Sequence, residues 1–324
     1  TLWSADDLTI AGDGALTVTS RSADGITSKD GLVVLAGEVS VEAADDGVRG
    51  KDYLVVHGGT LDVTAGGDGL KADNDSDATA GYVAVRGGDV SIEAGDDGVD
   101  ALTDLVVTDG TLTVSTSTEG LEAAAIVLAG GTVDVTASDD GLNASSDTTT
   151  PSLTITGGTV TVDADGDGLD SNGTLAMTGG DVVVAGPTTD GNGALDVDAD
   201  FAVSGGTLLA AGSAGMAMAP SSDGQGWVQA SLGTTAGAGS VVAVLDDTGT
   251  EVTSYTLSKE AANVLVSDPG LGSGETYTLT VDGAEVATVT AGEGTGGMGA
   301  GMGGRPDDGM GGGPGERGGE APPT

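Results

Sequence analysis

An acidic residue followed by glycine and an aliphatic residue returns repeatedly along the first two thirds of the chain. The glycines of consecutive copies are 22, 22, 29, 22, 21, 27 and 25 residues apart. One unit of this size cannot bury an apolar face alone, whereas stacked units share a continuous core, so the period predicts a solenoid. The acidic residues of the copies are Asp24, Asp46, Asp68, Asp97, Glu119, Asp140 and Asp167, and Asn192 begins a degenerate copy.

Each repeat divides into three short segments. In the copy that starts at Asp46, an alternating run at 53–56 is followed by a Gly58-Gly59 corner and a second alternating run at 60–64. Alternation of aliphatic and polar residues is typical of a strand with one buried face, and glycine supplies the φ angles that sharp corners need. Three strands in about 22 residues predict an all-β, right-handed parallel β-helix over residues 1–220, since parallel crossovers are right-handed by default.

The repeat ends at about residue 212. Runs of β-forming residues separated by turn signals such as Asp282-Gly283 then predict a small antiparallel β module over 221–291, expected to cover the last coil. The composition of 292–324, rich in glycine, methionine and proline, predicts a flexible tail.

The net charge of the chain is −42, from 51 acidic and 9 basic residues. This balance argues against a nucleic-acid partner, because phosphates would be repelled. There is no cysteine and only one histidine, His57, so thiolate and two-histidine metal sites are excluded. No apolar run is long enough to predict insertion into a membrane.

Stacking turns the recurring carboxylates into columns, with equivalent residues about 4.8 Å apart. Carboxylates this close repel one another unless cations or protons neutralise them, and hard oxygen ligands suit Ca²⁺. The alternative is that Asp-Gly is simply good turn chemistry and that the charge provides solubility. The predicted Ca²⁺ ligands are Asp45, Asp46, Asp68, Asp96, Asp97, Asp100, Asp139, Asp140, Asp167 and Asp170 in the columns, with Asp73, Asp75, Asp77, Asp163 and Asp165 in loops.

Four of the nine cations fall in two adjacent columns near the N-terminus. Lys29 and Lys51 are 22 residues apart, as are Arg49 and Lys71, so each pair is expected on neighbouring coils. Tyr53 and Tyr82 follow this segment at equivalent positions and are expected to complete it. Such a cluster could hold a uronate carboxylate, and the alternative is a set of salt bridges to acidic neighbours. These six residues are the predicted glycan-binding site.

Several segments resemble secreted bacterial β-helix proteins described as carbohydrate-binding domain-containing. They are 45–52, 57–61, 166–173 and 191–196. The resemblance implies a fold similar to that of polysaccharide lyases, bound calcium, and binding of cellulose and of acidic sugars such as polygalacturonate. It assigns no individual residue. With only seven aromatic residues in the chain, acidic sugars are favoured over crystalline cellulose.

The sequence therefore predicts a secreted or cell-surface protein that binds acidic polysaccharide or a cell-wall glycan with Ca²⁺ and without catalysis. No spacing singles out one base for a lyase reaction, although Lys51 or Lys71 could serve. The alternative function is structural, as a subunit of an extracellular fibre. In that case the exposed end of the β-helix near Thr1 would support self-association by stacking.

Overall fold

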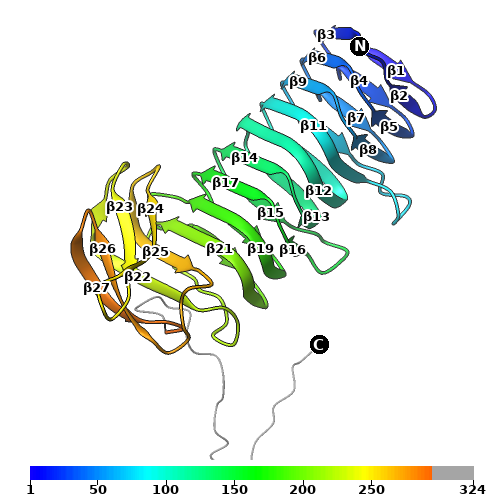
Figure 1. The fold of residues 1–324 in the computed structure, drawn as a ribbon. Coiled ribbons are helices and arrows are strands. Elements are labelled where there is room, and N and C mark those ends of the chain that lie inside the picture. The colour runs from blue at the N-terminus through cyan, green and yellow to red at the C-terminus, as the bar shows by residue number, and fades with distance from the viewer. Residues whose placement is uncertain (294–324) are drawn as a thin grey trace, which may run out of the picture.

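The computed structural model describes residues 1–293, so the predicted tail, from residue 294 on, lies outside the described residues. The described part is built from strands and turns without helices, and it forms a β-solenoid of about nine turns followed by a small antiparallel sheet (Figure 1). Among these residues no helix is long and apolar enough to span a membrane. The predicted all-β parallel helix is confirmed, with a mean turn spacing of about 23 residues.

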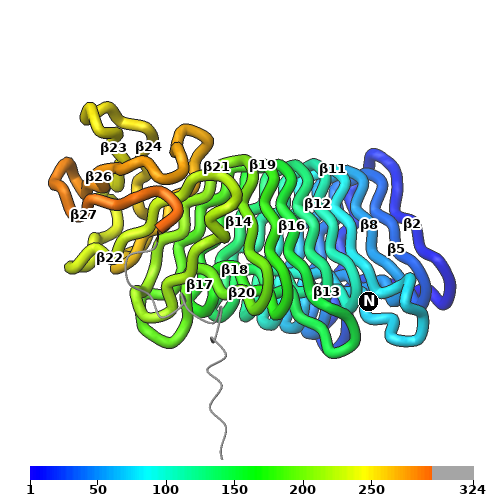
Figure 2. The backbone as a smooth tube through the Cα atoms, turned by 90° about the horizontal axis from the view of Figure 1, so that it is seen from below, coloured from blue at the N-terminus to red at the C-terminus, as the bar shows by residue number. Residues whose placement is uncertain are grey.

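The strands of the solenoid pair in parallel along three faces, which join at the corners into one continuous sheet, and Figure 2 shows the coils stacked side by side. The first face carries very short strands beside the Asp-Gly turns, and all of its pairings are parallel. In order, it consists of β1 (Leu2–Ser4), β4 (Ile26–Ser28), β7 (Val48–Gly50), β10 (Leu70–Ala72), the beginnings of β12 (Val99–Thr116) and β13 (Leu121–Leu128), β15 (Leu142–Ala144), β18 (Leu169–Ser171) and β20 (Leu195–Val197).

The second and third faces meet at the glycine corners, and several strands run through both. The second face consists of β2 (Leu8–Ile10), β5 (Gly31–Val34), β8 (Tyr53–Val56), parts of β11 (Tyr82–Ala94), β12 and β13, β16 (Ser152–Ile155), and the first halves of β19 (Thr174–Ala185) and β21 (Phe201–Gly212). The third face consists of β3 (Ala15–Ser20), β6 (Glu38–Ala43), β9 (Thr60–Ala65), parts of β11 and β12, β14 (Thr132–Ala137), β17 (Thr159–Ala164), and the second halves of β19 and β21.

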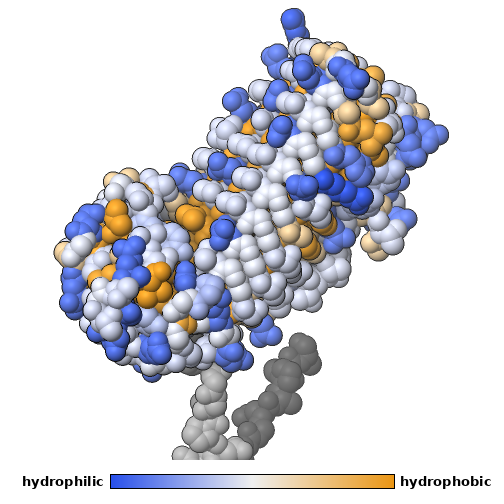
Figure 3. Space-filling view, viewed as in Figure 1, coloured by the Kyte–Doolittle hydropathy of each residue, from blue (hydrophilic) through white to orange (hydrophobic). Residues whose placement is uncertain are grey.

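Inward side chains of successive coils form apolar columns inside the solenoid. On the first face Ile26, Val48, Leu70, Val99 and Leu121 follow one another in register and are fully buried. Each such side chain contributes about 1.5–3 kcal/mol on burial, so the stack is stabilised mainly by this shared core. Outside, rows of side chains of intermediate hydropathy follow the coils, and strongly hydrophilic ones are most frequent near the N-terminal end and over the C-terminal strands (Figure 3).

Glycine at the turn of the repeat is required by close contacts within its own coil and with the next coil. A Cβ atom at Gly47 would overlap Val63 Cγ1 and would lie 2.6 Å from the carbonyl oxygen of Gly69. Replacing Gly47 by alanine is therefore expected to lower the free energy of unfolding by about 1–3 kcal/mol, as overpacking does. Urea denaturation measures the change. The control is Gly237→Ala, where no atom lies within 4 Å, and equal stability of the two variants would contradict this account.

The C-terminal strands continue the solenoid rather than standing apart from it. β25 (Ala261–Ser267) pairs antiparallel with the third-face part of β21, and β22 (Trp227–Ala236) pairs with β25. The predicted antiparallel pairing at this end is thus confirmed, and the edge of β21 is covered. A separate four-stranded sheet follows in the order β24 (Glu251–Thr256), β23 (Val241–Leu245), β26 (Thr276–Val281) and β27 (Ala284–Thr290).

Candidate functional site: an acidic ladder and a basic hollow

The acidic residues of the repeat form a hydrogen-bonded ladder along the first face, interrupted at Glu119. At Asp46, Asp68, Asp97, Asp140 and Asp167 a carboxylate oxygen accepts the backbone N–H of the equivalent residue in the next coil. The Glu119 carboxylate instead accepts the side-chain N–H of Asn143. The distance from the backbone nitrogen to the carboxylate oxygen is 3.2 Å from Asp68 N to Asp46 Oδ1 and 3.0 Å from Asp97 N to Asp68 Oδ1. It is 2.6 Å from Asp167 N to Asp140 Oδ1. Part of the acidic pattern is therefore structural, as the turn-chemistry alternative proposes. The acidic ladder comprises Asp46, Asp68, Asp97, Glu119, Asp140 and Asp167.

Burial of several carboxyl groups in the acidic ladder favours their protonated forms. Desolvation, with smaller contributions from neighbouring carboxylates, raises the pKa of Asp97 to about 8 and that of Glu119 to about 7. The same causes raise the pKa of Asp46 and of Asp167 to about 6, although a backbone N–H bonded to each opposes the shift. At neutral pH the carboxyl groups of Asp97 and Glu119 therefore hold protons or require cations.

Two groups of carboxylates come close enough to share one metal ion. Asp24, Asp45 and Asp46 form the first group and Asp68, Asp96 and Asp97 the second, with one oxygen from each residue within 4.8 Å of the others. The structure thus brings five predicted Ca²⁺ ligands together and adds Asp24. In the second group, however, Lys71 already forms an ion pair with Asp68. In the first group, Arg49 Nη1 lies 3.7 Å from an Asp24 carboxylate oxygen, a longer contact than that of Lys71 with Asp68, and neither Asp45 nor Asp46 forms an ion pair within residues 1–293. The first group therefore offers the better donor set for Ca²⁺.

The predicted loop ligands have other partners. Asp73 accepts hydrogen bonds from Arg49, and Asp77 accepts the backbone N–H of Thr79. Asp163 and Asp165 both bind Lys259 Nζ, at 2.9 and 2.7 Å. Asp75 is exposed, and no three-carboxylate group forms at these loops within the described part of the chain.

A second column runs beside the acidic ladder, three residues later in each coil, and its chemistry changes along the solenoid. Its N-terminal part contains Trp3 and the basic residues, and beyond Lys71 the column is acidic except for Asn143. The predicted pairing of Arg49 with Lys71 on adjacent coils is confirmed by the register. The second column consists of Trp3, Thr27, Arg49, Lys71, Asp100, Glu122, Asn143, Asp170 and Asp196.

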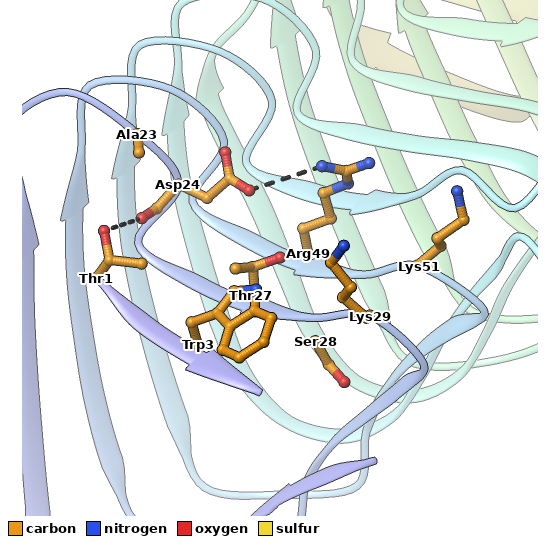
Figure 4. Close-up of a pocket in the computed structure, with 9 residues that line it drawn as sticks. All are labelled: Thr1, Trp3, Ala23, Asp24, Thr27, Ser28, Lys29, Arg49 and Lys51. Carbon is orange, nitrogen blue, oxygen red and sulfur yellow. Dashed lines mark hydrogen bonds and ion pairs between the residues drawn. The ribbon is translucent and has the colours of Figure 1, made fainter. Parts of the chain in front are cut away.

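The basic part of this face surrounds a hollow of about 360 Å³ (Figure 4). We call it the basic hollow and define it by Trp3, Lys29, Arg49 and Lys51, which line it together with Thr1, Ala23, Asp24, Thr27 and Ser28. The Trp3 indole is 55% exposed. Lys29 and Lys51 form no ion pair with any residue of 1–293, so their ammonium groups are available to a ligand.

The guanidinium of Arg49 is already fixed in place. It donates to both carboxylate oxygens of Asp73, at 3.2 and 2.5 Å, and its Nη1 lies 3.7 Å from Asp24. The salt-bridge alternative therefore holds for Arg49 but not for the two lysines.

Lys71 does not line the basic hollow. Its ammonium lies between the carboxylates of Asp68 and Asp100, both of which it binds. Burial alone would lower the pKa of Lys71, but the two carboxylates outweigh it and raise the pKa. An ammonium held in this way cannot act as a base, so Lys71 is not available for a lyase reaction.

The two predicted tyrosines lie elsewhere. Tyr53 and Tyr82 stack in register on the second face, with ring centroids 5.5 Å apart and an interplanar angle of 17°. The predicted adjacency of the two rings is confirmed, but neither lines the basic hollow. The aromatic surface of the basic hollow comes instead from Trp3. The sequence analysis missed this residue because it precedes the first Asp-Gly copy. Trp3 pairs with Thr27, 24 residues later, and extending the repeat backward by this spacing would have placed Trp3 in the column of Arg49 and Lys71.

The comparisons with known proteins agree with this architecture. A family described as "Carbohydrate-binding domain-containing protein" matches residues 1–188, which include the basic hollow and the acidic ladder. Neither the curated proteins nor the solved structures gave a significant match. Because the match covers more than half of the 324 residues, the chain belongs to the family of carbohydrate-binding domain-containing proteins.

Proposed function

We propose that this protein binds an acidic polysaccharide of the polygalacturonate type, without catalysis, through the basic hollow. Family membership and the solenoid fold support carbohydrate binding. The observation that carries the acidic specificity is the hollow itself, where two unpaired ammonium groups and an exposed indole meet on a chain of net charge −42. Lys29 and Lys51 would bind uronate carboxylates, and the Trp3 ring would lie against the face of a sugar.

The negative charge of the rest of the molecule does not prevent this binding. Exposed charges are screened beyond about 8 Å at physiological ionic strength, so a bound uronate experiences mainly the cations of the hollow. Among residues 1–293, Asp24 is the one carboxylate that lines the hollow, and it belongs to the first metal-capable group. Calcium held by Asp24, Asp45 and Asp46 would neutralise this group and could accept a uronate oxygen as a further ligand. Calcium dependence is therefore part of the proposal.

Binding is favoured over a lyase reaction and over fibre assembly. Lys71 is fixed between two carboxylates, which removes one of the two lysines considered as a base. Stacking of coils at the C-terminal end would require β25 to leave the edge of β21. Since polygalacturonate-type polymers lie outside cells, we also propose a secreted or cell-surface location. Self-association through the other end of the solenoid stays a prediction.

The double substitution Lys29→Ala with Lys51→Ala tests the site. It is expected to weaken binding of trigalacturonate at least tenfold, about 1.4 kcal/mol, in isothermal titration calorimetry. Because neither lysine forms an ion pair within residues 1–293, the melting temperature should stay unchanged.

The matched control is Arg21→Ala with Arg86→Ala, which removes two charges from exposed positions outside the hollow. This control should bind as the parent protein does. If both double variants lose the same amount of trigalacturonate affinity, the effect arises from the net charge of the protein and not from the hollow. Unchanged affinity in the lysine variant would exclude the hollow as the binding site.

A further inference from the structure

The internal repeat allows one part of the first face to be compared with another. In the fourth and fifth coils, Lys71 Nζ bridges Asp68 of the acidic ladder and Asp100 of the second column. Lys71 and Asp100 are register partners, and Asp68 lies three residues before Lys71. A positive charge is thus held between a ladder carboxylate and a carboxylate of the next coil.

The seventh and eighth coils repeat this arrangement without the lysine. Asp140 takes the place of Asp68, and it likewise accepts the backbone N–H of the next ladder residue. Asp170 takes the place of Asp100 and is the register partner of Asn143, which occupies the position of Lys71. Both carboxylates are therefore retained, while the cation that neutralises them is replaced by a shorter, neutral side chain.

Asn143 supplies an independent observation. Its side chain is buried, with the residue 9% exposed, and its Nδ2 donates to Glu119 Oε2 at 2.8 Å. Its Oδ1, in contrast, is fully buried and has no hydrogen-bond donor in the described part of the chain. The neighbouring Asp170 carboxylate, which is half-buried, also accepts no hydrogen bond and forms no ion pair within residues 1–293. A buried acceptor without a donor costs free energy unless something positive meets it.

We propose that a hard divalent cation of the calcium type binds between Asn143 Oδ1 and the carboxylate of Asp170, with Asp140 as a third ligand. Register partners on adjacent coils are about 4.8 Å apart. Two metal–oxygen bonds of about 2.4 Å span this separation, so one ion fits between the stacked side chains. The cation would neutralise the two carboxylates of the seventh and eighth coils, as the Lys71 ammonium neutralises Asp68 and Asp100 in the fourth and fifth. The site is separate from the basic hollow, which belongs to the first three coils, and it goes beyond the proposed glycan binding.

The test exchanges the cation for a lysine. Calcium bound per chain is measured by isothermal titration calorimetry with Ca²⁺ alone, in the parent protein and in Asn143→Lys, Asn143→Ala and Asp170→Asn. Each variant is expected to bind one ion fewer than the parent. Asn143→Lys should also melt several degrees higher than the parent in chelator, because its ammonium replaces the missing ion. The control Asp134→Asn, which removes an exposed carboxylate from the third face, should bind as many ions as the parent.

Unchanged calcium stoichiometry in Asp170→Asn and Asn143→Ala would overturn the proposal, as would a parent protein that binds no calcium. These two variants keep the test valid even if Asn143→Lys does not fold. Trigalacturonate affinity should be the same in the parent protein and in all four variants. Calcium stoichiometry therefore tests the cation site, and trigalacturonate affinity separately tests the proposed glycan site.

Discussion

Replacing Lys71 by methionine is expected to lower the free energy of unfolding at pH 8 by about 2–4 kcal/mol, because it leaves two carboxylates without their shared cation. The Lys71 ammonium binds Asp68, whose side chain is almost fully buried, and Asp100, whose side chain is three-quarters buried. Methionine retains most of the length and apolar surface of lysine, so the loss reports the charge rather than a cavity. For a domain of this size the change corresponds to roughly 5–12 °C in melting temperature.

Lys51→Met is the matched control for this substitution. Lys51 undergoes the same chemical change but forms no ion pair within residues 1–293, so its effect should stay within about 0.5 kcal/mol. Burial raises the pKa of Asp100. At pH 5 its carboxyl group therefore binds a proton more readily, and the loss caused by Lys71→Met should shrink. Equal melting temperatures of the two methionine variants at pH 8 would contradict the role assigned to Lys71.

The second large effect is a dependence of stability on pH in the absence of divalent cations. The folded-state pKa is raised to about 8 for Asp97 and to about 7 for Glu119 and Asp170, from ordinary values of 3.8 for aspartate and 4.5 for glutamate. Between pH 4 and 8 the folded protein therefore binds protons that the unfolded chain has released. Stability must then fall as the pH rises through this window.

In chelator, the melting temperature is accordingly expected to be higher at pH 5.5 than at pH 8.5. One unit of pKa shift corresponds to about 1.4 kcal/mol, but these carboxyl groups are partly exposed and screened, so we expect a total of about 2–4 kcal/mol. Millimolar Ca²⁺ should raise the melting temperature chiefly at pH 8.5, because the ligands must lose their protons to bind metal. A melting temperature that is constant or rises with pH in chelator, or identical melts with and without Ca²⁺ at pH 8.5, would contradict this account.

Local signals in the sequence were sufficient to predict the solenoid. The turn at Gly47 needs glycine because Val63 and the backbone of the next coil lie against it, so glycine returns at this position in seven consecutive copies, and Ala194 takes its place only in the degenerate last copy. Spacing also predicted which residues of adjacent coils meet, as for Arg49 with Lys71 and Tyr53 with Tyr82. These predictions succeed because a parallel stack converts sequence separation directly into contact.

The ion-pair pattern of the site was not predictable in the same way. Spacing placed four cations in one cluster, but Arg49 and Lys71 are ion-paired whereas Lys29 and Lys51 are not. The difference depends on where the longer loop after Lys71 places Asp73 and on which residue of the next coil becomes the register partner of Lys71. The unpaired oxygen of Asn143 is likewise visible only once its side-chain partners are known.

Trp3 provides the most direct test of the central claim, that the basic hollow binds an acidic glycan. The chain has two tryptophans, and Trp227 is only 4% exposed at the opposite end of the solenoid, so a change in emission on ligand binding reports Trp3. Titration with trigalacturonate in the presence of Ca²⁺ should shift the tryptophan emission to shorter wavelength, at the same ligand concentrations at which calorimetry detects binding. Trp3→Phe should abolish the shift. Calorimetric binding without any change in tryptophan emission would place the glycan elsewhere and contradict the account.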